Sequence, residues 1–441
     1  MESLPESTTI LIIGAGPTGL AAAISLIQRG CRDLVIVDAL PHGEQTSRAM
    51  TLHAATLEAL EEIGVAERLV KLGIKGRGMN MRSHSMALLS TRFSALNPYT
   101  KYPYVLLIPQ SAVERILLEH LETLGSRVLR PLRAIDLEPA PQGHIKVTFD
   151  GGRKIGTKYI IGSDGARSTI RQIAGIGFTD PDGLPVYEGV QHMVVADVVF
   201  SPLPPQAPLD LVEVTVSTPG VFIMIPLPTS WSNDNSGVGS NDRVHRIFFA
   251  VPEGNPPPDL PIEYLQKFVD TSGPPHLWSD PFKNPKPVRI SKKVWASRFR
   301  THSSIADTFY THLNAGTDEY SPLGRSILLL GDVAHIHSPA GDMGMNLGLR
   351  DAIGLGRAMA EHFEVALTSE EKAREVLETY AASRREKAIA TIRLTKRILG
   401  VSDIMRTESY FDLRYWIIRF MAKIPFVTRL GAWRLSGLGN R

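Results

Sequence analysis

Cysteine is almost absent from this 441-residue sequence, in which Cys31 is the single one. One cysteine excludes an intramolecular disulfide and a site built from several thiolates. Apolar runs of about 18 residues are also missing, which argues against a membrane-spanning helix. The first nine residues lack the basic and long apolar regions of a signal peptide, so the sequence predicts an intracellular, cytoplasmic protein.

A large excess of charge of one sign is missing too. The chain has 48 Lys and Arg against 45 Asp and Glu, a net charge of +3, which gives no general reason to expect a nucleic-acid partner. His335 and His337 are not accompanied by carboxylates at ligand spacing, so no metal site is predicted. A chain of this length, with 43% hydrophobic residues, should instead hold at least two packed units and a buried site.

The N-terminal part alternates strand and helix patterns. An apolar run at Thr9–Ile13, an alanine-rich helical segment at Gly16–Arg29 and a second apolar run at Leu34–Asp38 predict a βαβ unit with a parallel sheet. Further elements of this unit are expected at a helix over Gln110–Leu124 and at strands over Ile145–Phe149, Lys158–Ile161 and Ile327–Leu330. A helix should follow from about Asn346 to Phe363.

The middle of the chain has a different character. Between Gly183 and Trp295, β-rich runs at Met193–Phe200, Val212–Ile225 and Arg246–Val251 are separated by clusters of Pro, Gly, Ser and Asn. This pattern predicts a second, mainly antiparallel unit.

A glycine motif lies between the first strand and the first helix. Gly14 suits a tight turn, Gly16 lets backbone approach a pyrophosphate, and Gly19 lets the helix pack closely on the strand. The helix N-terminus attracts phosphate charge, and Asp38, at the end of the next strand, can accept hydrogen bonds from ribose hydroxyls. The motif predicts a dinucleotide site without separating FAD from NAD.

Two later motifs resolve that ambiguity. Gly162-Ser-Asp164-Gly165 follows one predicted strand, and Gly331-Asp332-Val-Ala-His335 follows another, continuing through Pro339-Ala-Gly341 to Gly344-Met345-Asn346. Together with the first motif, over about Ile10 to Arg385, the chain resembles the FAD-dependent aromatic-hydroxylase family, the p-hydroxybenzoate hydroxylase-like single-component flavoprotein monooxygenases. The resemblance implies an α/β fold: a Rossmann-like FAD-binding domain, an inserted antiparallel β substrate domain and a helical C-terminal region. The expected division is 1–182 and 296–366 for the FAD-binding domain, 183–295 for the substrate domain and 367–441 for the helical region.

The resemblance also implies roles for individual residues. Asp332 would hold a ribityl hydroxyl, and the helix near Asn346 would aim its positive end at the flavin, favouring the reduced ring. Asp164 would lie near the pyrophosphate or cap the helix that follows it; the two roles are compatible, and the first is preferred. The full set of expected cofactor-binding residues is Gly14, Gly16, Gly19, Asp38, Arg48, Gln110, Asp164, Gly165, Asp332, Gly344, Met345 and Asn346.

One departure concerns Asp342-Met343, where many relatives have Gly-Gln. A carboxylate at 342 would oppose flavin reduction if it pointed at the ring and would have no effect if it pointed outward.

The implied reaction is hydroxylation of a small aromatic or phenolic molecule. It would use noncovalent FAD, NADPH or NADH, and O2, through a flavin C4a-hydroperoxide. Pro339 is expected to line the oxygen-transfer site, with His335 as a weaker catalytic candidate. Epoxidation or Baeyer-Villiger oxygenation of a polyketide or terpenoid, and reduction of an isoprenoid, remain alternatives. Substrate-lining candidates are Tyr187, Phe222, Met224, Phe248 and Phe249, although such residues in strands more often form core.

The C-terminal segment from Arg384 to Arg441 is basic, and its apolar residues recur at helical spacing. It predicts either a helix packed over the substrate entrance or an interfacial membrane helix, and the first is preferred. The oligomeric state is not predicted.

Overall fold

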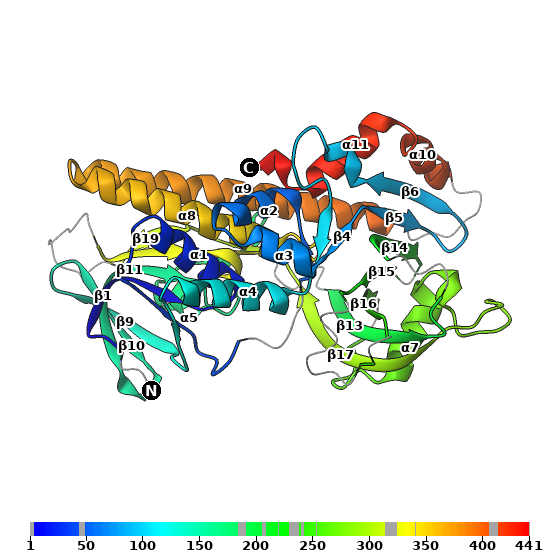
Figure 1. The fold of residues 1–441 in the computed structure, drawn as a ribbon, viewed down its shortest axis with the longest axis horizontal. Coiled ribbons are helices and arrows are strands. Elements are labelled where there is room, and N and C mark those ends of the chain that lie inside the picture. Colours follow the sequence, from blue (N-terminus) through cyan, green and yellow to red (C-terminus); the bar gives the residue numbers. More distant parts are fainter. Residues whose placement is uncertain are drawn as a thin grey trace.

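The computed structural model describes residues 4–43, 49–183, 191–204, 209–218, 220–228, 238–239, 242–252, 254–313, 324–339, 341–404 and 413–440. Arg48, Tyr187 and most of the polar segment 229–241 lie outside these ranges. The elements form two large sheets that lie side by side and two small three-stranded sheets, with two long helices running across the large ones (Figure 1). In the described part of the chain no helix has the length and apolarity that crossing a bilayer requires.

The first sheet is built on the predicted βαβ unit. Strand β1 (Ser7–Ile13) pairs in parallel with β2 (Leu34–Val37) and with β11 (Lys154–Gly162), and β11 pairs in parallel with β20 (Ser326–Leu329). The order is β19-β20-β11-β1-β2-β8, with β10 and β9 antiparallel beyond β11. The added strands are β8 (Val128–Leu129), β9 (Ala134–Ala140), β10 (His144–Phe149) and β19 (Tyr310–His312). Each strand predicted for this unit is therefore present.

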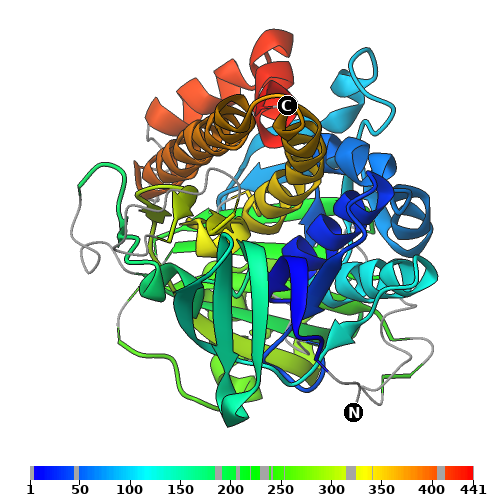
Figure 2. The ribbon, with the colours of Figure 1, turned by 90° about the vertical axis from the view of Figure 1, so that its left-hand side faces the viewer.

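Helices cover this sheet and meet through small side chains. Figure 2 shows α8 (Gly344–Ala366) and α9 (Glu370–Ile404) above the sheet, with α1 (Pro17–Gln28) and α4 (Gln110–Thr123) beside them. Ser25 of α1 donates to the Ile353 carbonyl oxygen of α8 at 3.0 Å. A Cβ at Gly356 would lie 2.1 Å from the Ser25 hydroxyl, so only glycine allows this approach. The two helices thus pack backbone to backbone.

The second sheet has the order β17-β13-β16-β15-β14-β5-β6. Its strands are β5 (Gly78–Arg82), β6 (Ala87–Arg92), β13 (Gln191–Ser201), β14 (Leu211–Ser217), β15 (Gly220–Pro226), β16 (Val244–Val251) and β17 (Arg289–Thr301). The β-rich runs expected between Gly183 and Trp295 form its centre. The sheet also includes the β5–β6 hairpin, which comes from the segment before residue 183 and joins β14 in parallel.

The two faces of this sheet have different neighbours. Phe222, Met224 and Phe249 pack with residues of α7 (Ile262–Ser272) in one apolar cluster. Phe248 instead belongs to a cluster on the opposite face with Met193, Val195, Ala250, Ile223, Trp295 and Phe299. Three of the candidate pocket residues are therefore core, because alternate residues of a strand face opposite sides. Of the described candidates, Phe248 alone shares the face of Arg246.

A buried ion pair lies on that second face. The Arg246 guanidinium donates from Nε to Asp197 Oδ1 at 2.6 Å and from Nη2 to Asp197 Oδ2 at 2.7 Å. Its Nη1 reaches the Ala49 carbonyl oxygen at 3.4 Å, which links the second sheet to the segment after Arg48. The sequence analysis did not predict this pair, although one acidic and one basic residue within otherwise apolar predicted strands could have indicated it.

The remaining elements complete the junction between the sheets. They are β3 (Thr51–Leu52), α2 (Ala54–Glu62), α3 (Ala66–Leu72), β4 (Ile74–Gly76), β7 (Val105–Leu107), α5 (Thr169–Ile173), β12 (Phe178–Thr179), β18 (Ser304–Ala306), β21 (His335–Ile336), α10 (Leu413–Met421) and α11 (Pro425–Leu435). Ala432 of α11 and Leu438 pack with Met50 and Ile225. Arg350 donates to the carbonyl oxygens of Gly437 and Asn440 at 3.2 and 3.1 Å. The end of the chain is thus fixed against α8.

We predict that Asp197→Ala lowers the free energy of unfolding by about 3–5 kcal/mol, because the Arg246 charge stays buried without its carboxylate. Glu138→Ala is the matched control, since it breaks the exposed Lys146–Glu138 pair and should cost under about 1 kcal/mol. Urea unfolding of both variants measures the difference. Equal losses would show that the buried pair contributes no more than a surface pair.

Candidate cofactor and substrate site

The turn after β1 is shaped by close backbone contacts. Gly14 has φ +105°, and a Cβ there would lie 2.2 Å from the Ser163 carbonyl oxygen. A Cβ at Gly19 would lie 1.9 Å from the Gly14 carbonyl oxygen. Around Gly16, by contrast, no atom lies within 4 Å of an added Cβ. Gly14 and Gly19 are therefore required by the fold, whereas Gly16 borders open space at the start of α1.

Two helix N-termini converge beside this space. Thr18, in the first turn of α1, lies against two glycines: a Cβ at Gly331 or Gly348 would come within 2.8 or 2.6 Å of its hydroxyl. Helix α8 begins at Gly344, two residues before the predicted start, and Met343 gives its end no side-chain cap. Because helix N-termini carry partial positive charge, this arrangement fits an anionic group such as a dinucleotide. Thr18 lay inside the first motif but was not predicted as a contact.

Asp38 organises the turn that it was expected to serve. Its Oδ2 accepts from the Ala15 amide at 2.7 Å, and its Oδ1 accepts from the Leu40 amide at 2.8 Å. Arg130, which follows β8, lies 3.1 Å from Oδ1 and was not predicted. The carboxylate has further lone pairs, so the contact with a ribose hydroxyl stays a prediction.

Asp164 acts as a helix cap. Its Oδ1 accepts from the Ser168 hydroxyl at 2.6 Å, and its Oδ2 accepts from the Thr169 amide at 2.8 Å. Burial raises the pKa of this carboxyl, and these hydrogen bonds oppose that rise. The capping alternative is therefore realised, and the role near the pyrophosphate stays a prediction. Gly165, at φ +84°, borders open space, as Gly16 does.

Asp342 binds the backbone of the segment after Arg48, a role that the sequence did not predict. Its Oδ2 accepts from the Met50 amide at 2.8 Å, the Thr51 amide at 2.6 Å and the Thr51 hydroxyl at 2.9 Å. Asn346 completes the contact: its Oδ1 accepts from the His53 amide, and its Nδ2 donates to the Thr51 carbonyl oxygen, each at 2.8 Å. We call these two side chains and residues 50–53 the latch.

The latch holds the loop before α8 in a strained conformation. Asp342 has φ +50°, a left-handed conformation that costs a residue with a Cβ about 1 kcal/mol or more. Three hydrogen bonds to its carboxylate offset that cost. His53 adds a contact from its Nε2 to the Gly341 carbonyl oxygen at 2.8 Å. Burial lowers the His53 pKa to about 4, so this imidazole is neutral at pH 7 and donates through Nε2–H.

His335 is enclosed in a charged network between β21, α8 and α9. Its Nε2 lies 2.6 Å from Asp351 Oδ2, and Arg384 Nε donates to Asp351 Oδ1 at 2.6 Å. Burial alone would raise the Asp351 pKa, but Arg384 and His335 outweigh it and hold that pKa at about 2. Tyr380 donates to the Asp351 carbonyl oxygen at 2.6 Å. These contacts give His335 a supporting place in the fold.

The contacts of the remaining predicted residues are local, and their roles at the cofactor stay predictions. Asp332 is exposed directly after β20, and Met345 packs partly against the core. Pro339 is partly exposed, and its carbonyl oxygen accepts from the Asp342 amide at 2.9 Å. Gln110 Oε1 accepts from the Ala49 amide at 3.4 Å, next to the undescribed Arg48.

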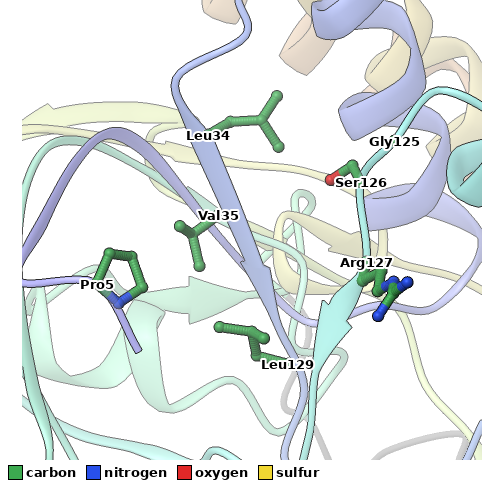
Figure 3. Close-up of a pocket in the computed structure, with 7 residues that line it drawn as sticks. All are labelled: Pro5, Leu34, Val35, Gly125, Ser126, Arg127 and Leu129. Carbon is green, nitrogen blue, oxygen red and sulfur yellow. The ribbon is translucent and has the colours of Figure 1, made fainter. Parts of the chain in front are cut away.

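A separate hollow lies along the edge of the first sheet at β2 and β8. It has a volume of about 670 Å³ and is lined by Pro5, Leu34, Val35, Gly125, Ser126, Arg127 and Leu129 (Figure 3). Leu34 begins β2, whereas the Gly14 turn lies beside the end of that strand. In parallel sheets ligands bind at the carboxyl ends of the strands, and the lining of this hollow includes no residue of the Gly14 turn.

Comparison with known proteins agrees with this geometry. The family model described as "FAD binding domain" matches residues 7–259 and 260–395. The chain belongs to the FAD-dependent aromatic-hydroxylase family. It is 30% identical over 437 residues to the aromatic compound monooxygenase YhjG of Bacillus subtilis (strain 168), which covers 98% of this chain and 75% of YhjG. It is 29% identical over 393 residues to pentachlorophenol 4-monooxygenase of Sphingobium chlorophenolicum, which covers 85% of this chain and 61% of that enzyme.

The fold matches solved structures of the family. p-Nitrophenol 4-monooxygenase PnpA from Pseudomonas putida DLL-E4 superposes with a TM-score of 0.73 at 19% identity, over 99% of this chain and 100% of that one. The predicted Rossmann-like domain with a β-rich second unit is thereby confirmed.

We predict that Gly16→Ala leaves the stability of the FAD-free protein unchanged while weakening FAD binding at least tenfold, because its methyl group enters the open space beside α1. Gly19→Ala is the contrasting variant and should lower the melting temperature, because its Cβ meets the Gly14 carbonyl. FAD titration by fluorescence and thermal unfolding separate the two effects. A Gly16→Ala protein that retains normal FAD affinity would show that the pyrophosphate lies elsewhere.

We predict a rank order of stability at position 342. Asp342→Ala should cost about 3 kcal/mol or more, because the amides of Met50 and Thr51 lose their acceptor and the left-handed strain remains. Asp342→Gly should cost about 1 kcal/mol less than Asp342→Ala, because the strain is relieved. Asp342→Asn, which keeps an acceptor oxygen, should cost least. Urea unfolding gives the order, and equal losses for Ala and Gly would contradict the strain argument.

Proposed function

We propose that this protein uses NADPH or NADH together with O2 to hydroxylate a small aromatic or phenolic molecule on noncovalently bound FAD. The observation that carries the proposal is the convergence of α1 and α8 beside the open space at Gly16. The names of the relatives, among them monooxygenases for pentachlorophenol and for tetracycline and rifampicin compounds, support an aromatic substrate. Because the chain spans only part of the length of these relatives, the substrate class is a proposal.

Different parts of the cofactor would be held by different groups of the protein. Gly16 and the start of α1 would receive the pyrophosphate, Asp332 the ribityl chain, and the start of α8 the flavin ring. Met345 and Asn346 would contribute backbone amides there, because the Asn346 side chain is engaged in the latch. Bound FAD supplies electron transfer from the nicotinamide to O2. The latch has the task of holding the loop from Gly341 to Gly344 beside the ring.

The substrate would lie against the sheet face of Phe248. Ile223, Trp295 and Phe299 share this face, and their side chains favour a largely apolar ring system. Arg246 lies on the same face, but Asp197 neutralises its charge through two hydrogen bonds. The pair therefore favours a neutral substrate over a carboxylate. Pro339 would line the space between this face and the cofactor.

Proton transfer near the loop would not involve a charged imidazole. Burial lowers the pKa of both His53 and His337 to about 4, so both rings are neutral at pH 7. Negative charge that develops on the reduced cofactor would instead meet the N-terminus of α8. His335 would support this arrangement through Asp351 without touching the substrate.

We predict that turnover with a phenolic or polycyclic aromatic substrate incorporates one oxygen atom from O2. Mass spectrometry of products formed under labelled ¹⁸O2, across a panel of neutral and carboxylated aromatic compounds, makes the measurement. Neutral compounds should be the better substrates, and Asp197→Asn should shift the preference toward carboxylates because Arg246 is then no longer neutralised. If NADPH is consumed and the product contains no label but has a reduced double bond, the protein is a reductase and the proposal of hydroxylation is wrong.

A further inference from the structure

A cluster of exposed apolar side chains lies at the C-terminal end of the chain. We call Trp416, Ile417, Phe420, Met421 and Phe426 the C-terminal patch; their exposed fractions are 51%, 52%, 67%, 42% and 70%. Large exposed apolar residues are otherwise scattered singly over the described surface. Contiguous exposed patches of this kind mark interaction sites.

The patch is the outer face of a helix whose inner face is packed. Tyr415 of α10 is buried in a cluster with Met86, Leu88 and Val214, and Ile418 packs against the same cluster. Helix α10 lies beside β6 at the edge of the molecule (Figure 1). The prediction that the C-terminal segment forms a packed helix therefore describes only the inner face of α10, because its outer face is apolar and exposed.

The charge around the patch has one sign. From Leu413 to Arg441 the sequence contains six Lys or Arg residues and no Asp or Glu. Arg419, Lys423, Arg429 and Arg434 are exposed. The Arg419 guanidinium lies 5.8 Å from the centre of the Trp416 ring, so basic and aromatic groups share one face.

We propose that the C-terminal patch docks on an anionic lipid surface, with α10 lying in the plane of the bilayer interface. Aromatic and aliphatic side chains flanked by Lys and Arg are the composition that such interfacial helices use. A second copy of this chain fits less well, because it would bring like charges together across the interface. In the described residues no helix can cross a bilayer, so α10 would rest on the surface.

The helix that follows the patch reaches the candidate site. Helix α11 follows α10, and its Leu435 lies 3.6 Å from the position of a Cβ built at Gly341. Ala432 packs with Met50 at the edge of the latch. A docked protein would therefore receive apolar substrate from the bilayer close to the site. This last step rests on the proposed function, whereas docking itself does not.

Co-sedimentation of the FAD-loaded, full-length protein with sucrose-filled vesicles tests the docking. We expect binding to phosphatidylcholine vesicles that contain a third of phosphatidylserine, and little binding to pure phosphatidylcholine. Binding should fall strongly in about 1 M salt, where the Debye length is about 3 Å. Equal binding to both kinds of vesicle, or to neither, would overturn the proposal.

Variants assign the binding to this patch. Arg419→Gln with Lys423→Gln should weaken binding roughly 25-fold, since each charge near an anionic surface contributes about 1 kcal/mol. Trp416→Ala with Phe420→Ala should abolish it. Phe282→Ala is the matched control, because Phe282 is 99% exposed but lies in the second unit, far along the chain from the patch. Loss of binding in the control as well would overturn the assignment.

Two further outcomes are decisive. In the first, light scattering shows a wild-type dimer that dissociates in the variant Trp416→Ala with Phe420→Ala, and the wild type binds no vesicles. This result would assign the patch to a second copy of the chain and overturn the proposal. Vesicle binding by a protein that hydroxylates no compound would leave docking in place and remove the proposed function, so the two failures are distinguishable.

Discussion

The close approach of three backbones around Thr18 is the constraint on which the rest of the structure depends. Gly14 and Gly19 bring β1 and α1 together, and Gly331 and Gly348 bring β20 and α8 onto the side of α1. Because each contact is shorter than a Cβ would allow, the two helices must begin at nearly the same place. Their partial positive charges then add in one open space, which is the basis of cofactor binding in this family.

The latch connects the start of α8 to the segment that contacts the second sheet. The Asp342 carboxylate fixes the backbone at Met50 and Thr51, and Arg246 reaches the neighbouring Ala49 from the second sheet. A carboxylate next to a flavin would oppose reduction of the flavin. The Asp342 carboxylate accepts hydrogen bonds from backbone amides. The loop before α8, the segment after Arg48 and the second sheet are thus joined through polar contacts with backbone.

The C-terminal helices connect the site to the surface. Helix α11 and the residues after it pack on Met50 and on Arg350, so the end of the chain is held beside the latch. Helix α10 packs one face against Met86, Leu88 and Val214 and leaves its other face apolar among basic residues.

The sequence by itself determined the elements whose signals are local. The glycine spacing after β1, the apolar runs of β11, β20 and the second sheet, and the motif around Asp332 depend on neighbours within a few residues, and they predicted the fold and the cofactor. The tertiary structure alone decided where polar side chains point. Asp342 and Asn346 bind a segment almost 300 residues away in the sequence. Phe222 and Phe248 lie on opposite faces of the same sheet. Hydrogen-bond partners distant in sequence, and the choice of buried face, are set by packing between elements, which no local pattern encodes.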